Sequence, residues 1–271
     1  MARKLKLFVL NLLDIFHIFK IVSFQNFFSF YFTFYRKDSL KLIQIGIRPL
    51  NNRRVSIRRG SIIDRDVIKY VFYNRYHLPW LPLRADAVIL DLGSNIGLTV
   101  LDLKVIYPHS IVLGYEMDKN NFDIALSNTS GLEGCGLFNL AVWKENKTVK
   151  YDADDYEDAF SVLAKENDHP GKTSIKTVRA ITINSIVEQH RLTKIDYVKM
   201  DLEGAERYVF LETSCEWLGI VQQLGIEIHD RDFCDEIIRV LEARGFTCRK
   251  DSAHRCLVRA AKGLSDQPVG V

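Results

Sequence analysis

Apolar and polar positions alternate regularly beyond residue 86. Five short apolar runs have the length of buried strands: Ala87–Leu92, Ile111–Tyr115, Leu137–Val142, Tyr197–Met200 and Leu224–Ile228. The segments between them are long enough for crossover helices. Strands that are buried on both faces read as continuous apolar runs, so the pattern predicts an α/β fold with a parallel sheet, doubly wound with helices on both faces.

Two weaker patterns precede this region and one interrupts it. Residues Val55–Ile57 predict a short strand, and apolar residues at helical spacing predict a helix from about Asp64 to Tyr76. The connection between Val142 and Tyr197 is too long for one crossover. Its β-prone runs at 147–151 and 177–183 predict an added hairpin or lid, before a helix at about 184–190. We interpret the acidic stretch at 152–158 as a solvated loop rather than a metal site.

The N-terminal region is apolar but interrupted. Leu5–Phe34 is rich in Leu, Ile and Phe, yet Asp14 and Lys20 break it, which argues against a transmembrane helix and against a signal peptide. Helices that pack on the rest of the protein, or on a second subunit in a homo-oligomer, are the favoured interpretation. A helix in the membrane interface is the alternative, with the basic side chains of residues 3, 4, 6 and 20 at lipid head groups. We therefore expect a basic, apolar helical extension over residues 1–54 and one catalytic domain over residues 55–271.

Charge and cysteine content bear on location. Residues 1–60 contain 12 Lys+Arg and 2 Asp+Glu, a balance of +10, whereas the remainder has 25 minus 32, or −7. The basic N-terminal part is thus suited to an anionic surface, and peripheral membrane contact through residues 1–50 is left open. The 5 cysteines form no Cys-x-x-Cys pair, which indicates reduced structural thiols and a cytoplasmic protein, free or at the inner face of a membrane.

A glycine-containing loop follows the first strand of the repeated pattern. The segment Asp91-Leu-Gly-Ser-Asn-Ile-Gly97 runs from an apolar strand into a helical pattern, so its backbone N–H groups lie at a helix N-terminus and can hold an anion. A carboxylate at position 91 would repel the phosphates of a dinucleotide but attract the ammonium of a methionine moiety. The loop therefore predicts S-adenosylmethionine rather than NAD, with these contacts: Asp91, Gly93, Ser94, Asn95 and Gly97.

The next two strands supply the rest of the predicted cofactor site. Glu116 ends the second strand, about twenty residues past the loop, where an acid can accept hydrogen bonds from ribose hydroxyls. Met117 follows it and is placed to pack on adenine. Asn139, near the end of the third strand, is either a polar contact to the adenine or a turn-capping residue.

Charged groups concentrate after the fourth strand. Lys199, Asp201, Glu203 and Glu206 surround its carboxyl end, where open parallel sheets bind ligands. One ion pair with the lysine explains only two of them, so the surplus indicates chemistry or a metal. Glu227 and His229 alternate on the next strand and therefore share a face.

This cluster is the candidate catalytic site. Asp201 or His229 is a candidate base for a hydroxyl, and Glu203 belongs to the same group. The carboxylates and the imidazole are equally a candidate site for a divalent cation that orients substrate hydroxyls. The residues alone leave both interpretations open.

These segments resemble the FkbM-type family of class I methyltransferases. The loop at 91–97 is similar to the family's Asp-x-Gly-x-Asn-x-Gly, Lys199-Met-Asp-Leu-Glu-Gly-Ala-Glu206 to its Lys-x-Asp-x-Glu-Gly-x-Glu, and Glu227-Ile-His229 to its Glu-x-His. The resemblance spans about residues 56–259. It implies a Rossmann-like seven-stranded sheet with an antiparallel last strand, S-adenosylmethionine as methyl donor, and transfer to an oxygen of a sugar, glycolipid or natural product.

Two other classes of protein compete with this interpretation. A non-methylating, Rossmann-like nucleotide-binding enzyme would need a three-glycine loop, which is absent from the sequence. A ligand-binding module would not need the charged cluster. Nucleic acid is not an expected partner, because no base-flipping element is present and the basic residues of the N-terminal region are interleaved with bulky apolar ones.

Overall fold

The computed structural model describes residues 16–24, 27, 41–152, 175–251, 254 and 257–263. Most of the acidic stretch 152–158 lies outside these residues, as do three of the four basic residues proposed to face lipid, at positions 3, 4 and 6. None of the described helices is long and apolar enough to cross a membrane.

A seven-stranded sheet forms the centre of the molecule, with the order β11-β12-β10-β9-β3-β4-β5. Neighbouring strands from β10 to β5 pair in parallel, whereas β12 is antiparallel to both of its neighbours. The predicted fold class, including the antiparallel last strand, is therefore confirmed. The strands are β3 (Val88–Leu92), β4 (Ile111–Tyr115), β5 (Cys135–Phe138), β9 (Tyr197–Asp201), β10 (Gln223–Glu227), β11 (Phe246–Lys250) and β12 (Leu257–Lys262).

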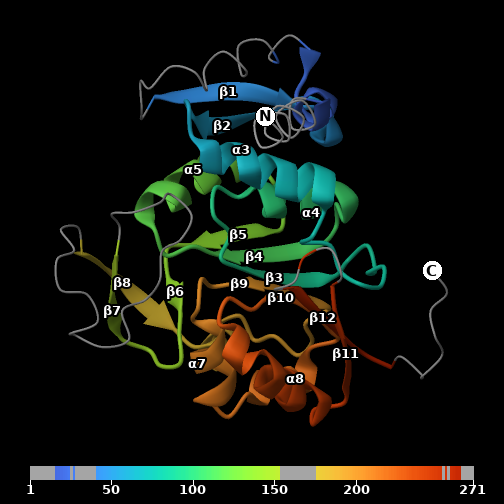
Figure 1. Ribbon diagram of the computed structural model, residues 1–271, viewed down its shortest axis with the longest axis vertical. Coiled ribbons are helices and arrows are strands. Elements are labelled where there is room, and N and C mark those ends of the chain that lie inside the picture. The colour runs from blue at the N-terminus through green and yellow to red at the C-terminus, as the bar shows by residue number, and fades with distance from the viewer. Residues whose placement is uncertain are drawn as a thin grey trace, which may run out of the picture.

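Helices cover both faces of this sheet (Figure 1). They are α4 (Leu98–Ile106), α5 (Lys119–Thr129), α6 (Ile183–Gln189), α7 (Glu206–Leu211), α8 (Cys234–Glu242) and the short 3-10 turns η3 (Glu216–Ile220) and η4 (Arg231–Phe233). Successive strand residues enter different cores: Ile89 packs with residues of α4, whereas Leu90 packs with α7 and η3. This alternation is why continuous apolar runs predicted a doubly wound sheet.

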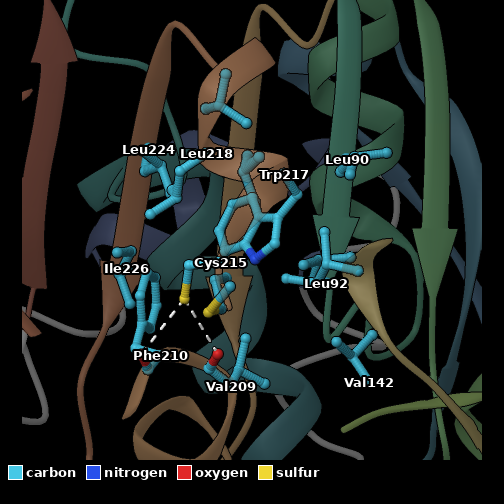
Figure 2. Close-up of a cluster of buried hydrophobic side chains, with 14 of the residues drawn as sticks. Leu90, Leu92, Val142, Val209, Phe210, Cys215, Trp217, Leu218, Leu224 and Ile226 are labelled. Carbon is cyan, nitrogen blue, oxygen red and sulfur yellow. Dashed lines mark hydrogen bonds between the residues drawn. The ribbon is translucent and has the colours of Figure 1, made fainter. Parts of the chain in front are cut away.

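The core beneath α7 and η3 contains a buried thiol. Figure 2 shows Cys215 among Leu90, Leu92, Phe210 and Trp217, with its sulfur directed at two backbone carbonyls. The Sγ–O distances are 3.5 Å to Val209 and 3.3 Å to Phe210. Burial raises the pKa of this thiol. The four cysteines among the described residues are free, as predicted.

The N-terminal region contains a β-hairpin that the sequence did not predict. β1 (Leu42–Ile47) pairs antiparallel with β2 (Arg53–Arg58) through the turn η1 (Arg48–Leu50). The predicted strand at 55–57 is part of β2, so the expected division after residue 54 falls inside this strand. Its partner β1 was missed because residues 1–54 were expected to form a helical extension.

This hairpin packs onto the catalytic domain rather than standing apart. Residues 16–21 are helical, and Val22 forms an isolated bridge with Ile47. Ile18, Ile47 and Val55 share one apolar core with α3 (Ile62–Lys69), α4 and α5. Figure 1 shows the hairpin stacked beyond these helices. A π turn, η2 (Tyr70–Asn74), extends α3, which confirms the predicted helix over this stretch.

The apolar run Leu137–Val142, predicted as the third strand of the central sheet, is divided between two sheets. β5 ends at Phe138, and β6 (Ala141–Val142) joins β7 (Thr148–Asp152) and β8 (Ile175–Ile181) in a three-stranded sheet beside the core (Figure 1). Asn139 causes the change of direction, because its Nδ2 donates hydrogen bonds of 2.9 Å to the carbonyls of Glu116 and Met117. The predicted hairpin before α6 is confirmed as β7 and β8.

Candidate functional site

The loop between β3 and α4 can adopt its course only with glycine at two positions. Gly93 has φ +85°, and a Cβ there would lie 1.9 Å from the backbone oxygen of Asp201. Gly97 has φ +79° and caps α4, where a Cβ would lie 3.0 Å from the Cα of Ala125. Left-handed backbone favours glycine. The two glycines therefore bring the loop against β9 and α5.

Asp91 lies behind this loop and is fully buried. One carboxylate oxygen accepts a hydrogen bond from the Thr99 hydroxyl, and the other is 3.6 Å from Lys199 Nζ without a hydrogen-bond partner. Lys199 in turn donates to the Gly93 carbonyl at 2.7 Å. Asp91 thus fixes the position of the loop, and its expected contact with a methionine ammonium stays a prediction.

Glu116 connects the ends of β3 and β4. Its two carboxylate oxygens accept hydrogen bonds of 2.8 Å from the backbone N–H groups of Asn95 and Asp118. Burial raises the pKa of this carboxyl to about 7, against the opposing effect of the two backbone donors. Met117 packs beside it at the edge of the small-sheet core. Asn139 holds the backbone of both residues, which is the turn-capping role considered above.

Two adjoining cavities open at the carboxyl ends of these strands. Val67, Tyr70, Gly93, Asn95, Asp201 and Glu227 line both of them. The first, which we call the cofactor cavity, is also lined by Tyr115, Glu116, Met117, Leu140, Ala141, Val142 and Glu203. The second, which we call the acceptor cavity, is also lined by Ser94, Thr99, Tyr76, Lys199 and His254.

The charged cluster predicted after the fourth strand is assembled between β9 and β10. These strands pair in parallel with Asp201 opposite Glu227. His229 Nε2 lies 3.2 Å from Glu203, 3.7 Å from Asp201 and 3.9 Å from Glu227, measured to the nearest carboxylate oxygen. Its Nδ1 lies 3.1 Å from Glu206. The convergence expected from the strand order is therefore present.

The carboxylates determine the charge of His229. Burial lowers the pKa of its imidazole, but the hydrogen bond and charge of Glu206, with the charges of Glu203 and Asp201, outweigh burial and raise the pKa to about 10. Lys199 behaves likewise, since Asp201 and Asp91 outweigh its burial and raise the pKa of its ammonium. A protonated imidazole cannot take a proton from a hydroxyl, so this environment favours Asp201 over His229 as the candidate base.

Glu206 stabilises the loop after β9, which contains Glu203 of the charged cluster. Its buried carboxylate accepts backbone hydrogen bonds from Leu202 at 2.8 Å and Gly204 at 3.0 Å, in addition to its contact with His229. Glu203 consequently has φ +51°, an uncommon conformation for a residue other than glycine. Such strain persists only where its surroundings enforce it, which fits a functional loop.

Asp201, Glu203 and His229 also form a candidate site for a metal ion. One ligand atom from each lies within 4.8 Å of the others. The hydrogen bond from His229 Nδ1 to a carboxylate is the usual support for a ligating imidazole. A cation bound at Nε2 would displace the proton that His229 carries.

The sequence missed the residues that reach the site from outside the strand ends. Tyr70 and Tyr76 line the acceptor cavity from the segment after α3, and His254 lines it from the loop before β12. The sequence contained no signal for them, since single aromatic residues far apart along the chain are common. Thr99 donates a hydrogen bond to Asp91, but the only feature of the sequence that could have indicated this role is its position two residues after Gly97.

Comparison with known proteins assigns the family. The family model of the methyltransferase FkbM domain matches residues 91–248, more than half of the chain, including the loop after β3 and the charged cluster. The chain belongs to this family. It is therefore an S-adenosylmethionine-dependent methyltransferase, as the resemblance of its motifs predicted.

Individual relatives of this FkbM-domain protein are distant. It is 26% identical over 190 residues to Methyltransferase 1 of Beauveria bassiana strain ARSEF 2860, covering 61% of this chain and 74% of that protein. Among solved structures, the Methanococcus jannaschii fibrillarin pre-rRNA processing protein has 15% identity and TM-score 0.41, covering 83% of this chain and 81% of its own. Precorrin-6y C5,15-methyltransferase from Geobacter metallireducens GS-15 has 12% identity and TM-score 0.36, and the match covers 68% of this chain and 83% of that protein's chain.

Proposed function

We propose that this protein transfers a methyl group from S-adenosylmethionine to a hydroxyl oxygen of a sugar, glycolipid or other natural product. The observation that carries the proposal is the position of Asp201, which lines both cavities and so stands where donor and acceptor would meet. Its Oδ2 lies 3.5 Å from Lys199 Nζ, and its buried Oδ1 makes no hydrogen bond but lies 3.7 Å from His229 Nε2. A carboxylate that is 30% exposed at this junction is suited to accept a hydrogen bond from a hydroxyl.

The residues of the cofactor cavity fit the methyl donor. Glu116 would accept hydrogen bonds from ribose hydroxyls, and Met117 with Leu140 and Val142 offers apolar surface for adenine. Gly93 lets the loop pass close to β9, which would leave space at the end of β3 for the amino-acid portion of S-adenosylmethionine. Asn139 would shape this cavity by holding the backbone of Glu116 and Met117. Gly97 would shape it by the turn that it permits, whereas Ser94 lines the acceptor cavity.

Proton removal would fall to Asp201. The donor supplies an electrophilic methyl on a sulfonium sulfur, so the acceptor oxygen bonds the methyl carbon as the sulfur–carbon bond breaks. The acceptor proton passes to Asp201, since His229 already carries a proton at neutral pH. Lys199 and His229 hold this carboxylate from two sides.

A divalent cation held by Asp201, Glu203 and His229 is the second form of this proposal. It would coordinate the acceptor hydroxyl and lower its pKa. The cluster favours this form because four carboxylates, including Glu206 and Glu227, surround one imidazole.

The test is methyl transfer from labelled S-adenosylmethionine to a panel of glycosides, glycolipids and phenols, with EDTA or Mg²⁺ added in parallel. O-methylated product that is unaffected by EDTA supports the base form, and product lost in EDTA and restored by Mg²⁺ supports the cation form. Protein that binds S-adenosylhomocysteine yet methylates only amines or thiols would overturn O-methylation. Titration with NAD checks the non-methylating alternative.

The affinity for S-adenosylhomocysteine is expected to weaken as pH falls from 8 to 6. Glu116 has a pKa of about 7, and ribose hydroxyls donate to its ionised form. If only that form binds, the dissociation constant measured by calorimetry rises about tenfold over this interval. Glu116→Gln should bind weakly at both pH values and lose the dependence. An unchanged affinity in the wild type would contradict the assigned role of Glu116.

We also propose that the N-terminal region contacts anionic membrane. Phe16 and Phe24 are 53% and 61% exposed, Lys20 Nζ lies 4.5 Å from the centre of the Phe16 ring, and Arg48 lies over Phe19. Exposed aromatics beside basic side chains suit the interface between lipid head groups and acyl chains.

Vesicle co-sedimentation tests this contact. The wild type is expected to pellet with vesicles containing phosphatidylglycerol and to remain in solution with pure phosphatidylcholine. Phe16→Ser with Phe24→Ser should reduce the pelleted fraction several-fold, whereas Ile111→Ser, at an apolar residue on β4 that is 47% exposed, should not. Equal loss in the control, or no binding by the wild type, would contradict the proposal.

A further inference from the structure

Three aromatic rings form one wall of the acceptor cavity. Tyr70 and Tyr76 come from the segment after α3, and His254 comes from the loop before β12. The ring centroids of Tyr76 and His254 are 4.6 Å apart, and Tyr70 lies 6.2 Å from Tyr76 and 6.5 Å from His254. Tyr70 is 47% exposed. These rings therefore form a continuous group with free surface at the cavity.

The backbone beneath this wall is fixed to the central sheet. Arg259 of β12 donates to the Leu78 carbonyl at 2.5 Å, and the Tyr197 hydroxyl of β9 donates to the His77 carbonyl at 2.9 Å. The buried His77 ring lies 2.9 Å from Asp102 of α4. A wall anchored to two strands and a helix is preformed, as a recognition surface requires.

Carboxylates line the same cavity. Asp201 and Glu227 belong to both cavities, and one oxygen of Glu227 lies 3.3 Å from His254 Nε2. Lys199, which also lines this cavity, is already engaged by Asp91, Asp201 and the Gly93 carbonyl. The charged groups left for a ligand in this cavity are therefore the carboxylates of Asp201 and Glu227. They attract hydroxyl donors and repel phosphates and carboxylates.

Aromatic faces combined with carboxylate acceptors match a neutral pyranose ring. The C–H groups of such a ring are weakly positive and pack on the negative face of an aromatic side chain. Its hydroxyls donate to carboxylates. A planar phenol would use the aromatic wall but would leave most of the acceptors unpaired, which is costly in a cavity.

We propose that Tyr70, Tyr76 and His254 form the acceptor subsite, where an uncharged pyranose stacks with one hydroxyl at Asp201. This inference rests on the proposed O-methylation and specifies its substrate: a neutral sugar ring, not a sugar phosphate or a uronic acid. Tyr70, with the largest free surface, carries most of the stacking.

Binding of methyl β-glycopyranosides to the protein saturated with S-adenosylhomocysteine tests the subsite without requiring catalysis. The probes are methyl β-D-glucopyranoside, galactopyranoside and mannopyranoside, with glucose 6-phosphate as the anionic comparison, observed by saturation-transfer NMR. At least one neutral glycoside is expected to bind, and Tyr70→Ala to weaken its affinity about tenfold. Tyr70→Phe should retain the affinity. Tyr73→Ala is the matched control, since Tyr73 is 42% exposed on the same turn but does not line the cavity.

These binding measurements test the sugar subsite independently of the proposed O-methylation. Absence of glycoside binding, equal binding of glucose 6-phosphate, or equal losses in the Tyr70→Ala and Tyr73→Ala proteins would overturn the subsite. Loss confined to Tyr70→Ala supports it, even where a transfer assay detects no product and the O-methylation proposal fails. Because Tyr70 also lines the cofactor cavity, the affinity for S-adenosylhomocysteine is measured for each variant, and glycoside affinities are compared with every variant saturated.

Discussion

Replacing Asp201 with asparagine is expected to reduce methyl transfer about 10²- to 10⁴-fold while leaving the affinity for S-adenosylhomocysteine nearly unchanged. Asparagine keeps the shape of the side chain and can still accept a hydrogen bond from Lys199, but it neither takes a proton nor ligates a cation well. The loss should appear in kcat, because the carboxylate interacts most strongly with the acceptor hydroxyl in the transition state of methyl transfer. Single-turnover assays with labelled donor measure this rate directly.

Asp230→Asn is the matched control for this substitution. Asp230 is 32% exposed and lies 2.9 Å from Arg207, so it resembles Asp201, which is 30% exposed and paired with Lys199. Asp230 lines neither described cavity. Its variant should retain full activity. Full activity of Asp201→Asn would exclude Asp201 both as base and as metal ligand, and the function of the cluster would need another explanation.

The strand pattern and the strand-end residues could be predicted because both follow from local chain geometry. A buried parallel strand has to be apolar over its whole length, and polar side chains at its carboxyl end necessarily meet those of its neighbours. That is why the sequence predicts Asp201, Glu203 and His229 at one place, where the structure has both carboxylates within 3.7 Å of the His229 Nε2 atom.

What could not be predicted depends on contacts between distant segments. The acceptor cavity needs Tyr70 beside His254, and nothing local to either residue indicates the other. The break between β5 and β6 depends on an amide hydrogen bond from Asn139 to the end of β4, although the sequence there is a single apolar run. The proton on His229 likewise follows from Glu206, whose role as the organiser of the loop is visible only in its backbone contacts.

Gly93→Ala is expected to abolish binding of S-adenosylhomocysteine and to destabilise the fold. The left-handed backbone at φ +85° alone costs an alanine about 1 kcal/mol or more. The added Cβ would also lie 1.9 Å from the backbone oxygen of Asp201, so the loop has to move away from β9. A total loss of about 2 kcal/mol lowers the melting temperature by about 4–8 °C in a domain of this size. Calorimetry measures both effects.

Gly131→Ala separates backbone strain from the steric clash. Gly131 has φ +76°, and a Cβ there would meet nothing within 4 Å. This variant should show only the strain, a shift of a few degrees, with unchanged cofactor affinity. If the two variants behave alike, the close approach of the loop to β9 is not what shapes the cofactor cavity. If only Gly93→Ala loses binding, the close contact between this loop and the Asp201 backbone is what shapes the cofactor cavity.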